Sequence, residues 1–138
     1  MTKVILDTNI YVGWLRRRAH ADLLLGREVV RYLSTVVIME LRAGVVSRRT
    51  ERALDQPVRP YAEAGRILSP SASIFHRAGQ VLRELRARGR EVRRASLVGD
   101  ALIALTARAN GATVWTADAG DFEAIRAIAP FFLRLAGT

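Results

Sequence analysis

Cysteine is absent from this 138-residue chain, and histidine occurs only twice, as His20 and His76. The chain therefore forms no disulfide, has no thiol nucleophile and cannot build a thiolate metal site. Two histidines make a poor imidazole cluster, so any metal ion in this protein has to be held mainly by oxygen ligands.

Long hydrophobic runs are also missing. The longest are about five to six residues, whereas about 20 apolar residues are needed to span a bilayer. Met1 leads within three residues into a predicted strand, which leaves no room for a signal peptide. We therefore expect a cytoplasmic protein with no membrane partner. The length and the 50% hydrophobic content predict a single domain over residues 1–138.

Negative charge is scarce beside positive charge. The 13 acidic residues stand against 22 lysines and arginines, which leaves a formal net charge of +9. Such an excess predicts a polyanionic partner, with nucleic acid as the leading candidate. All the basic residues except Lys3 are arginine. Arginine suits bidentate phosphate recognition, but a genome of biased base composition explains the preference equally well.

Hydrophobic periodicity and turn residues predict alternating strands and helices. Strands are predicted at 3–6, 29–33, 65–68, 112–116 and 131–135. Helices are predicted at about 8–17, 34–47, 71–88, 100–109 and 121–128, with a shorter helix that breaks at Pro57 and Pro60. The polar arm 88–94 is predicted to be a loop. This alternation predicts an α/β fold with a parallel sheet of about five short strands flanked by helices.

Four acidic residues lie within or beside apolar segments that are predicted to form the hydrophobic core. They are Asp7, Glu40, Asp100 and Asp118. An isolated carboxylate costs several kcal/mol to bury, so four of them in one small chain indicate that they gather around a shared cation. Asp7 and Asp118 both follow predicted strands, where sites form in open parallel sheets. The sequence therefore predicts a metal site built from oxygen ligands.

Each acid also has a simpler explanation. Asp7 and Asp100 each stand where a helix is predicted to begin, so either residue can be an N-cap. Asp118 and Asp121 have the spacing of a capping pair before the next helix. Glu40 has only apolar neighbours three and four residues away along its helix. It therefore needs a partner from elsewhere, either a shared cation or an arginine of another helix.

Four segments, taken together and in order, resemble the PIN-domain ribonucleases and, among them, the VapC toxins of bacterial type II toxin–antitoxin modules. The segments are 4–9, 39–44, 99–104 and 114–122. Each motif is weak by itself, but all four at these separations form a specific pattern. The similarity runs from residue 3 to about residue 128.

The resemblance implies a PIN-like α/β/α sandwich in which the four acids are catalytic and bind Mg²⁺ or Mn²⁺. Such a protein cleaves single-stranded or structured RNA, for example tRNA or rRNA loops, and so inhibits translation. Asp121 competes with Asp118 for the last metal-binding position, and Gly99 stands where such toxins often carry asparagine. The residues expected to support the ligands or to position phosphates are Thr8, Asn9 and Thr116.

The expected chemistry follows from the charges. Hard oxygen ligands favour Mg²⁺ or Mn²⁺, which activates a water molecule and neutralises charge on the scissile phosphate. Asp100 or Asp118 is expected to orient or deprotonate that water. The arm residues Arg90, Arg93 and Arg94 are candidates for binding the RNA phosphates, with a solvated surface as the simpler interpretation. The partners that the resemblance implies are a VapB-like antitoxin and a second copy of the chain in a homodimer.

Other functions remain open at this point. A housekeeping PIN nuclease in RNA maturation would carry the same acids, and only a neighbouring antitoxin gene would separate it from a toxin. A phosphoacceptor α/β domain using Asp7 is a different class. A phosphatase of that kind requires a second aspartate two residues after the first, but Asn9 occupies that position. A signalling receiver requires a lysine after a late strand, but the only lysine is Lys3. The complete set of acids argues against an RNA-binding module without catalysis.

Overall fold

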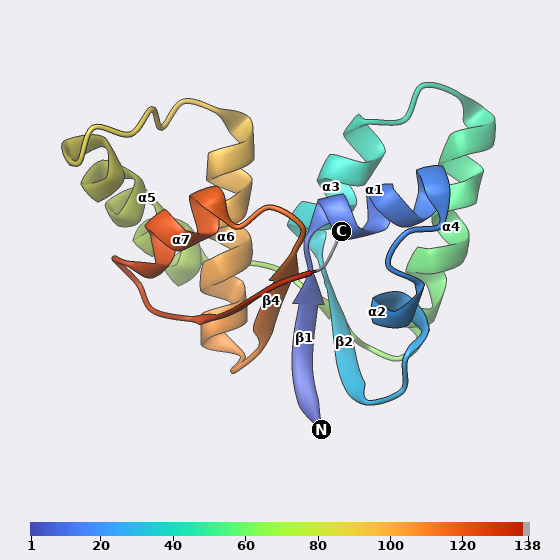
Figure 1. Cartoon of the computed structure of the whole chain (residues 1–138). Helices are drawn as coiled ribbons and strands as arrows, with labels where there is room; N and C mark the ends of the chain where they lie inside the picture. Colours follow the sequence, from blue (N-terminus) through green and yellow to red (C-terminus); the bar gives the residue numbers. More distant parts are fainter. Residues whose placement is uncertain (137–138) are drawn as a thin grey trace.

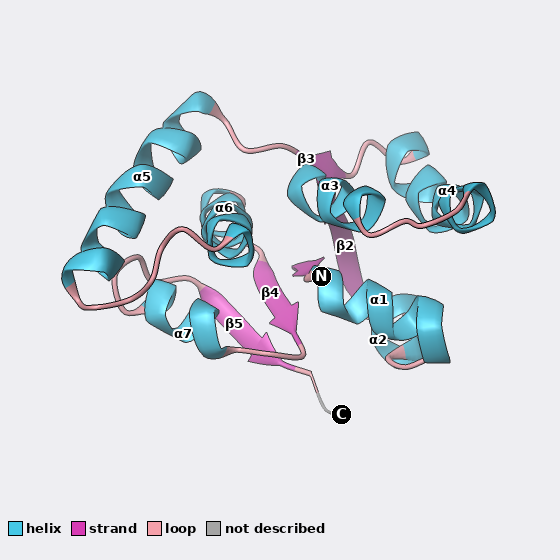
Figure 2. Cartoon of the chain, turned by 90° about the horizontal axis from the view of Figure 1, so that it is seen from above, coloured by secondary structure: helices cyan, strands magenta, loops and turns pink. Residues whose placement is uncertain are grey.

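The structure is a computed structural model in which residues 1–136 are described; the last two residues of the domain predicted over 1–138 lie outside this part. Five parallel strands form one sheet in the order β3-β2-β1-β4-β5; β1, β2 and β4 are labelled in Figure 1, and β3 and β5 in Figure 2. The strands are β1 (Thr2–Leu6), β2 (Val29–Ser34), β3 (Ile67–Leu68), β4 (Thr113–Thr116) and β5 (Phe132–Leu135). The chain winds outward from β1 in one direction and then returns to β4 and β5. The carboxyl ends of β1 and β4 therefore border a topological switch point, where open α/β sheets place their sites.

The helices form a layer on each face of the sheet. They are α1 (Thr8–Arg17), α2 (Ala21–Leu25), α3 (Thr35–Ala43), α4 (Arg48–Glu63), α5 (Ala72–Ala87), α6 (Ala95–Ala109) and α7 (Gly120–Arg126). Figures 1 and 2 show α1 to α4 on one side of the sheet and α5 to α7 on the other. Right-handed crossovers explain this division, because reversing the direction of winding moves the connecting helices to the opposite face. The predicted α/β/α fold with about five short parallel strands is confirmed.

The core lies where β1 and β4 meet α6. Val4, Ile5 and Leu6 of β1 are fully buried. In α6, every residue from 101 to 107 is buried, as expected for a helix that is apolar nearly all round. This packing fixes the position of α6 against the two strands that border the switch point. Within residues 1–136, no helix is long and apolar enough to cross a membrane.

Helix α4 corrects the prediction that Pro57 and Pro60 break a shorter helix. The helix is continuous over Arg48–Glu63 and contains both prolines. Each proline removes one helical hydrogen bond and crowds the preceding turn. Leu54 is buried and Tyr61 packs against the core, so the packing of the amphipathic helix offsets the local loss.

Helix α6 corrects the prediction that a helix begins at Asp100. It begins at Ala95, and Leu97 in its first turn is fully buried, which docks this turn on the core. Asp100 therefore lies in the second turn and is not an N-cap. Two smaller differences concern α3, which ends at Ala43 rather than near residue 47, and α2, which lies in a segment without a predicted element.

Candidate metal and nucleic-acid site

Asp7 stands at the switch point, between the end of β1 and the start of α1. It is the N-cap of α1, and its Oδ1 accepts a hydrogen bond from the Thr8 backbone N–H at 2.8 Å. The capping explanation is therefore right, but it accounts for only one of the two carboxylate oxygens. The other, Oδ2, accepts a hydrogen bond from the Thr116 hydroxyl at the end of β4, also at 2.8 Å. Asp7 is 6% exposed, and these two donors hold its carboxylate in one orientation.

Asn9 and Thr116 join the turn after β1 to the turn after β4. The Asn9 amide donates to the Thr116 hydroxyl at 3.1 Å, and Asn9 Oδ1 accepts from the Ala117 N–H at 3.1 Å. The Asp118 N–H donates to the same threonine hydroxyl at 3.1 Å. These contacts couple the position of Asp118 to the position of Asp7, although the two residues are far apart in the sequence.

Glu40 reaches the same region from α3. Its Oε1 accepts a hydrogen bond from the Thr8 hydroxyl at 2.7 Å. Arg42 turns away and pairs with Asp55 at 2.7 Å. No arginine within residues 1–136 forms an ion pair with Glu40, so the simpler explanation by an arginine of another helix is wrong for this part of the chain.

The four acids line one open cavity of about 360 Å³. Asp100 enters it from the second turn of α6, and Asp118 from the turn after β4. The predicted capping pair of Asp118 and Asp121 does not form, because the N-cap of α7 is Ala119, which makes no side-chain capping hydrogen bond, and Asp121 lies inside the helix. Asp118 Oδ1 accepts a hydrogen bond from the Gly120 N–H at 3.2 Å. The rest of the polar lining consists of Thr8, Asn9, Arg94, Ser96 and Asp121.

Burial and mutual repulsion govern the charge of this cavity. Burial, the largest cause, and the neighbouring charges of Asp7, Asp121, Glu40 and Asp118 together raise the pKa of Asp100 to about 8. Burial also raises the pKa of Asp7 to about 6, although the hydrogen bonds from Thr116 and Thr8 oppose this change. Carboxylates that raise one another's pKa in this way are ready to accept a compensating cation.

The donor set fits a hard divalent cation. Asp7, Glu40, Asp100 and Asp118 offer only carboxylate oxygen, and none of the four is in an ion pair within residues 1–136. Their side chains are not closed around one point, however: among the described residues, no three acidic or imidazole groups are arranged as a finished metal site. The chemistry of the donors therefore suits a metal ion, and a bound ion would require the oxygens to draw together.

Asp121 differs from the other acids because it is held by two arginines of the arm 88–94. Arg90 and Arg94 approach its Oδ1 at 2.9 and 3.0 Å. Partial burial would raise the pKa of Asp121, but the hydrogen bonds from Arg94 and Arg90 outweigh it and hold this pKa below its ordinary value. Arg93 points elsewhere; its side chain is 90% exposed and pairs with Glu91 at 3.3 Å. The sequence pattern gave no sign that two of the three candidate phosphate-binding arginines, Arg90 and Arg94, would pair with an acid of α7.

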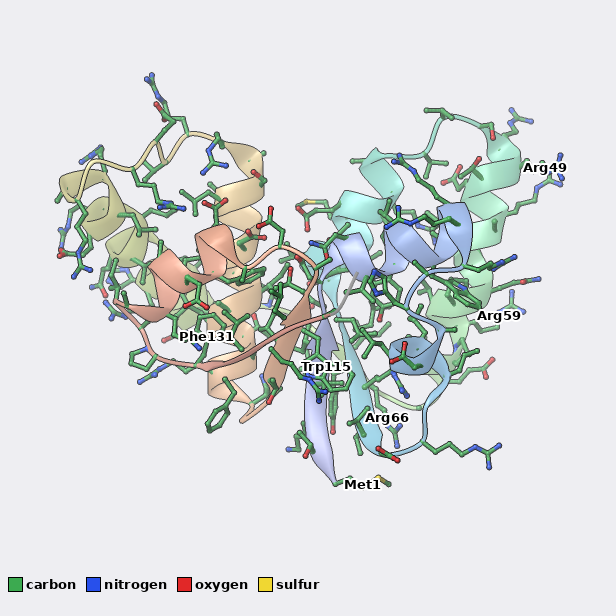
Figure 3. The ribbon with its side chains drawn as sticks, in the orientation of Figure 1. Met1, Arg49, Arg59, Arg66, Trp115 and Phe131 are labelled. Atoms are coloured by element: carbon green, nitrogen blue, oxygen red, sulfur yellow. The ribbon has the colours of Figure 1, made fainter. Side chains whose placement is uncertain are left out.

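A second, larger cavity of about 500 Å³, which no sequence pattern had predicted, lies between α1, α2 and α4. Its lining combines aromatic, apolar and cationic side chains and contains no acid; among them are Trp14, Arg18, Leu24, Arg31, Tyr61 and Arg66. The Arg18 guanidinium stacks over Trp14 at 4.9 Å from the ring centre. In Figure 3, Arg49 and Arg59 project outward from α4. The apolar run 23–25 and the prolines of α4 were the available signals for this cavity.

Comparison with known proteins agrees with this architecture. Residues 4–128 match the PIN domain family, and because the match covers most of the chain, the chain belongs to that family. Among individual proteins, it is similar to the plasmid stability protein StbB of Pseudomonas syringae pv. tomato, with 36% identity over 132 residues that cover 88% of this chain and 91% of the relative.

Two solved structures extend the comparison. FitAcB from Neisseria gonorrhoeae has a TM-score of 0.68 and 27% identity, covering 94% of this chain and 95% of the other. DNA-bound VapBC from Salmonella typhimurium has a TM-score of 0.71 and 25% identity, covering 97% and 98%. VapBC is a family of toxin–antitoxin systems. The resemblance to PIN-domain ribonucleases and VapC toxins is thus confirmed.

Proposed function

We propose that this protein is an endoribonuclease that depends on Mg²⁺ or Mn²⁺ and acts as the toxin of a VapBC-like module, cleaving single-stranded or looped RNA to inhibit translation. The observation that carries the proposal is the cavity at the switch point, lined by four carboxylates that form no ion pair with any described residue. Membership of the PIN domain family supports a nuclease, and the net charge of +9 supports a nucleic-acid substrate.

In this proposal, Asp7, Glu40, Asp100 and Asp118 hold the ion. When bound, the ion supplies an activated water molecule and neutralises charge on the scissile phosphate. Thr8 and Thr116 fix the Asp7 and Glu40 carboxylates, so that these two acids keep their orientation. Asp100 has the most strongly raised pKa of the described acids, which makes it, with Asp118, a candidate to orient the water or take its proton.

The direct test replaces single ligands by their neutral isosteres. Asp7→Asn, Glu40→Gln and Asp100→Asn should each abolish RNA cleavage and growth inhibition while the fold is retained. Each variant removes a charge from a repelling cluster, so the metal-free protein should be at least as resistant to thermal unfolding as the wild type. Cleavage of total RNA, circular dichroism and thermal melting measure these effects.

Glu123→Gln is a matched control, because Glu123 is an exposed carboxylate outside the cavity that pairs only with Arg126. This variant should cleave RNA like the wild type. If one of the three cavity variants cleaved RNA in Mg²⁺ as fast as the wild type, that residue would lose its assignment as a ligand. Mapping the cleavage sites in the same RNA samples identifies the substrate.

We also propose a VapB-like antitoxin as the partner, supported by the similarity to FitAcB and VapBC. The cavity between α1, α2 and α4 offers a docking surface for one of its segments. Three arginines and several aromatic and apolar groups line this cavity without any acid, so it favours an apolar peptide segment that carries a carboxylate.

Charge reversal tests this docking surface. Arg66→Glu should weaken the complex with the antitoxin encoded next to this gene by about tenfold or more, while the free protein still cleaves RNA. Arg49→Glu is the control, because Arg49 also projects from this side of the molecule but does not line the cavity (Figure 3). Equal affinities for the two variants, measured by calorimetry, would move the docking surface elsewhere. The homodimer stays a prediction, to be measured by light scattering of the free protein.

A further inference from the structure

The contacts of Asp121 set it apart from every other acid in the candidate site. Its Oδ1 accepts hydrogen bonds from Arg90 Nη2 at 2.9 Å, Arg90 Nε at 3.2 Å and Arg94 Nη2 at 3.0 Å. Its Oδ2 accepts one from Arg94 Nη1 at 3.2 Å. Both oxygens are therefore occupied, and the side chain is only 16% exposed. Charge-assisted contacts of this number and geometry are stronger than ordinary surface ion pairs.

The charges argue against a metal ion on this carboxylate. Two guanidinium groups already overcompensate the single negative charge of Asp121. A divalent cation bound there would either lie beside two positive groups or displace both of them, and each choice is unfavourable. The four acids that lack an ion pair do not face this conflict. The structure thus separates four acids that can bind a cation from Asp121, which instead pairs with two arginines.

The location of Asp121 shows how it can hold the arginines of the arm in place. Arg94 directly precedes α6 and lines the acidic cavity, although no residue of the arm belongs to a regular element. Asp121 lies in the first turn of α7, just after the turn that carries Asp118. Its carboxylate therefore ties the arm to the rim of the cavity. Arg90 is less exposed than Arg94, at 37% against 48%, and also approaches the Gly120 carbonyl at 3.4 Å, which suits a supporting role.

We propose that Asp121 is a positioning residue rather than a metal ligand: it holds Arg94, with Arg90 as support, at the rim of the acidic cavity, where the Arg94 guanidinium binds an RNA phosphate next to the scissile one. This inference rests on the proposed ribonuclease function. It gives the three candidate arginines different roles: Arg94 binds phosphate, Arg90 supports Arg94, and Arg93 points into solvent beside Glu91.

The first experiment separates a ligand from a positioning residue by metal binding without RNA. Mn²⁺ binding is measured by calorimetry on the wild type, Asp118→Asn and Asp121→Asn. Asp118→Asn should lower Mn²⁺ affinity by about tenfold or more, while Asp121→Asn should leave it unchanged within error. If Asp121→Asn lost Mn²⁺ affinity to the same extent as Asp118→Asn, the proposal would be overturned and Asp121 would be a ligand.

The second experiment measures the phosphate contact. Binding of a fluorescent RNA hairpin is titrated at several salt concentrations, with Ca²⁺ in place of Mg²⁺ to slow cleavage. Asp121→Asn and Arg94→Gln should each reduce the salt slope by about 0.7 log units, which corresponds to one phosphate contact. The double variant should lose no more than Arg94→Gln alone, because both changes remove the same contact. In steady-state cleavage, Asp121→Asn should raise KM more than it lowers kcat.

Two controls complete the design. Arg126→Gln removes an exposed arginine from the same helix as Asp121 and should leave the slope unchanged. Asp121→Glu keeps a carboxylate for the two arginines and should restore most of the slope. An unchanged slope in Asp121→Asn would overturn the proposal even if Mn²⁺ binding were normal. Failure of the proposed function looks different, because the wild type itself would then neither bind Mn²⁺ nor cleave RNA.

Discussion

Gly99 sets the position of the Glu40 carboxylate, although it carries no functional group. A Cβ at this position would lie 3.0 Å from Glu40 Oε2 and 3.4 Å from Cδ. Gly99 is buried inside α6, one residue before Asp100, so its missing side chain lets the acids of α3 and α6 approach each other. The asparagine common at this position in VapC-like toxins would require a different Glu40 orientation.

We predict that Gly99→Ala maintains or raises the stability of the protein but lowers its Mn²⁺ affinity and its RNA cleavage. Alanine in a helix interior is about 1 kcal/mol more favourable than glycine, and the crowded group is the flexible end of a side chain. The free energy of unfolding should therefore stay the same or rise, while Mn²⁺ affinity and RNA cleavage fall because Glu40 has to move. Urea unfolding and Mn²⁺ calorimetry measure the two effects. A variant with wild-type Mn²⁺ affinity would show that Glu40 adjusts without loss.

At the scale of the elements, α4 combines a helix with two residues that oppose helices. Pro57 and Pro60 are three residues apart, and both line the cavity between α1, α2 and α4. Their neighbour Tyr61 takes part in a hydrogen bond with the hydroxyl of Tyr11, at 3.0 Å. The helix thus keeps an unfavourable local sequence on the face that we propose for antitoxin binding. This combination is expected where function and stability make different demands.

We predict that Pro60→Ala stabilises the protein and weakens the antitoxin complex. The helix gains about 3 kcal/mol when an interior proline is replaced, but the unfolded chain gains freedom worth up to about 1 kcal/mol, so a net increase of about 2 kcal/mol is expected. Arg59→Ala, at the neighbouring exposed position, is the control and should change stability by less than about 0.5 kcal/mol. Urea unfolding measures both variants. A loss of stability in Pro60→Ala would mean that the proline ring itself packs favourably.

For the whole molecule, the acidic cavity links folding to pH. The pKa values of Asp7 and Asp100 are raised to about 6 and about 8, above the ordinary value of 3.8 that applies in the unfolded chain. Between pH 3.8 and about pH 8 the folded protein binds more protons than the unfolded chain, so the free energy of unfolding falls as pH rises. The stability that comes from protonated Asp7 and Asp100 is fully present below pH 3.8. It is lost as pH rises through about 6 for Asp7 and about 8 for Asp100.

We therefore predict that the metal-free protein loses stability, on the order of 3 kcal/mol, between pH 5 and pH 8. Added Mg²⁺ or Mn²⁺ should restore it, and more strongly at pH 8 than at pH 5, because deprotonated carboxylates bind the ion. Asp100→Asn should flatten the profile, since it removes the group with the larger shift. Thermal melting across this pH range with and without metal measures these effects. A flat profile for the wild type would show that the acids do not repel one another as inferred.

The sequence by itself determined the fold class and the identity of the acids that meet. Its strands carry apolar runs, and Asp7 and Asp118 follow two of them, so a parallel sheet necessarily brings these residues to one edge. Glu40 was recognisable because a charge among apolar helical neighbours needs a partner from outside the helix. These conclusions depend on local pattern and on general rules of sheet topology, both of which can be read along the chain.

Only the tertiary structure decided the rest. Whether α4 continues through Pro57 and Pro60 depends on a packing energy that involves distant residues, and the same holds for the start of α6 at Ala95. The distinction between Asp118 and Asp121 is of this kind as well. Both acids fit the sequence motif equally well. They differ because Arg90 and Arg94 of the arm 88–94 form ion pairs with Asp121, although they are distant from it in the sequence. Charge pairing across space is set by the packed structure, because sequence spacing carries no record of which groups meet.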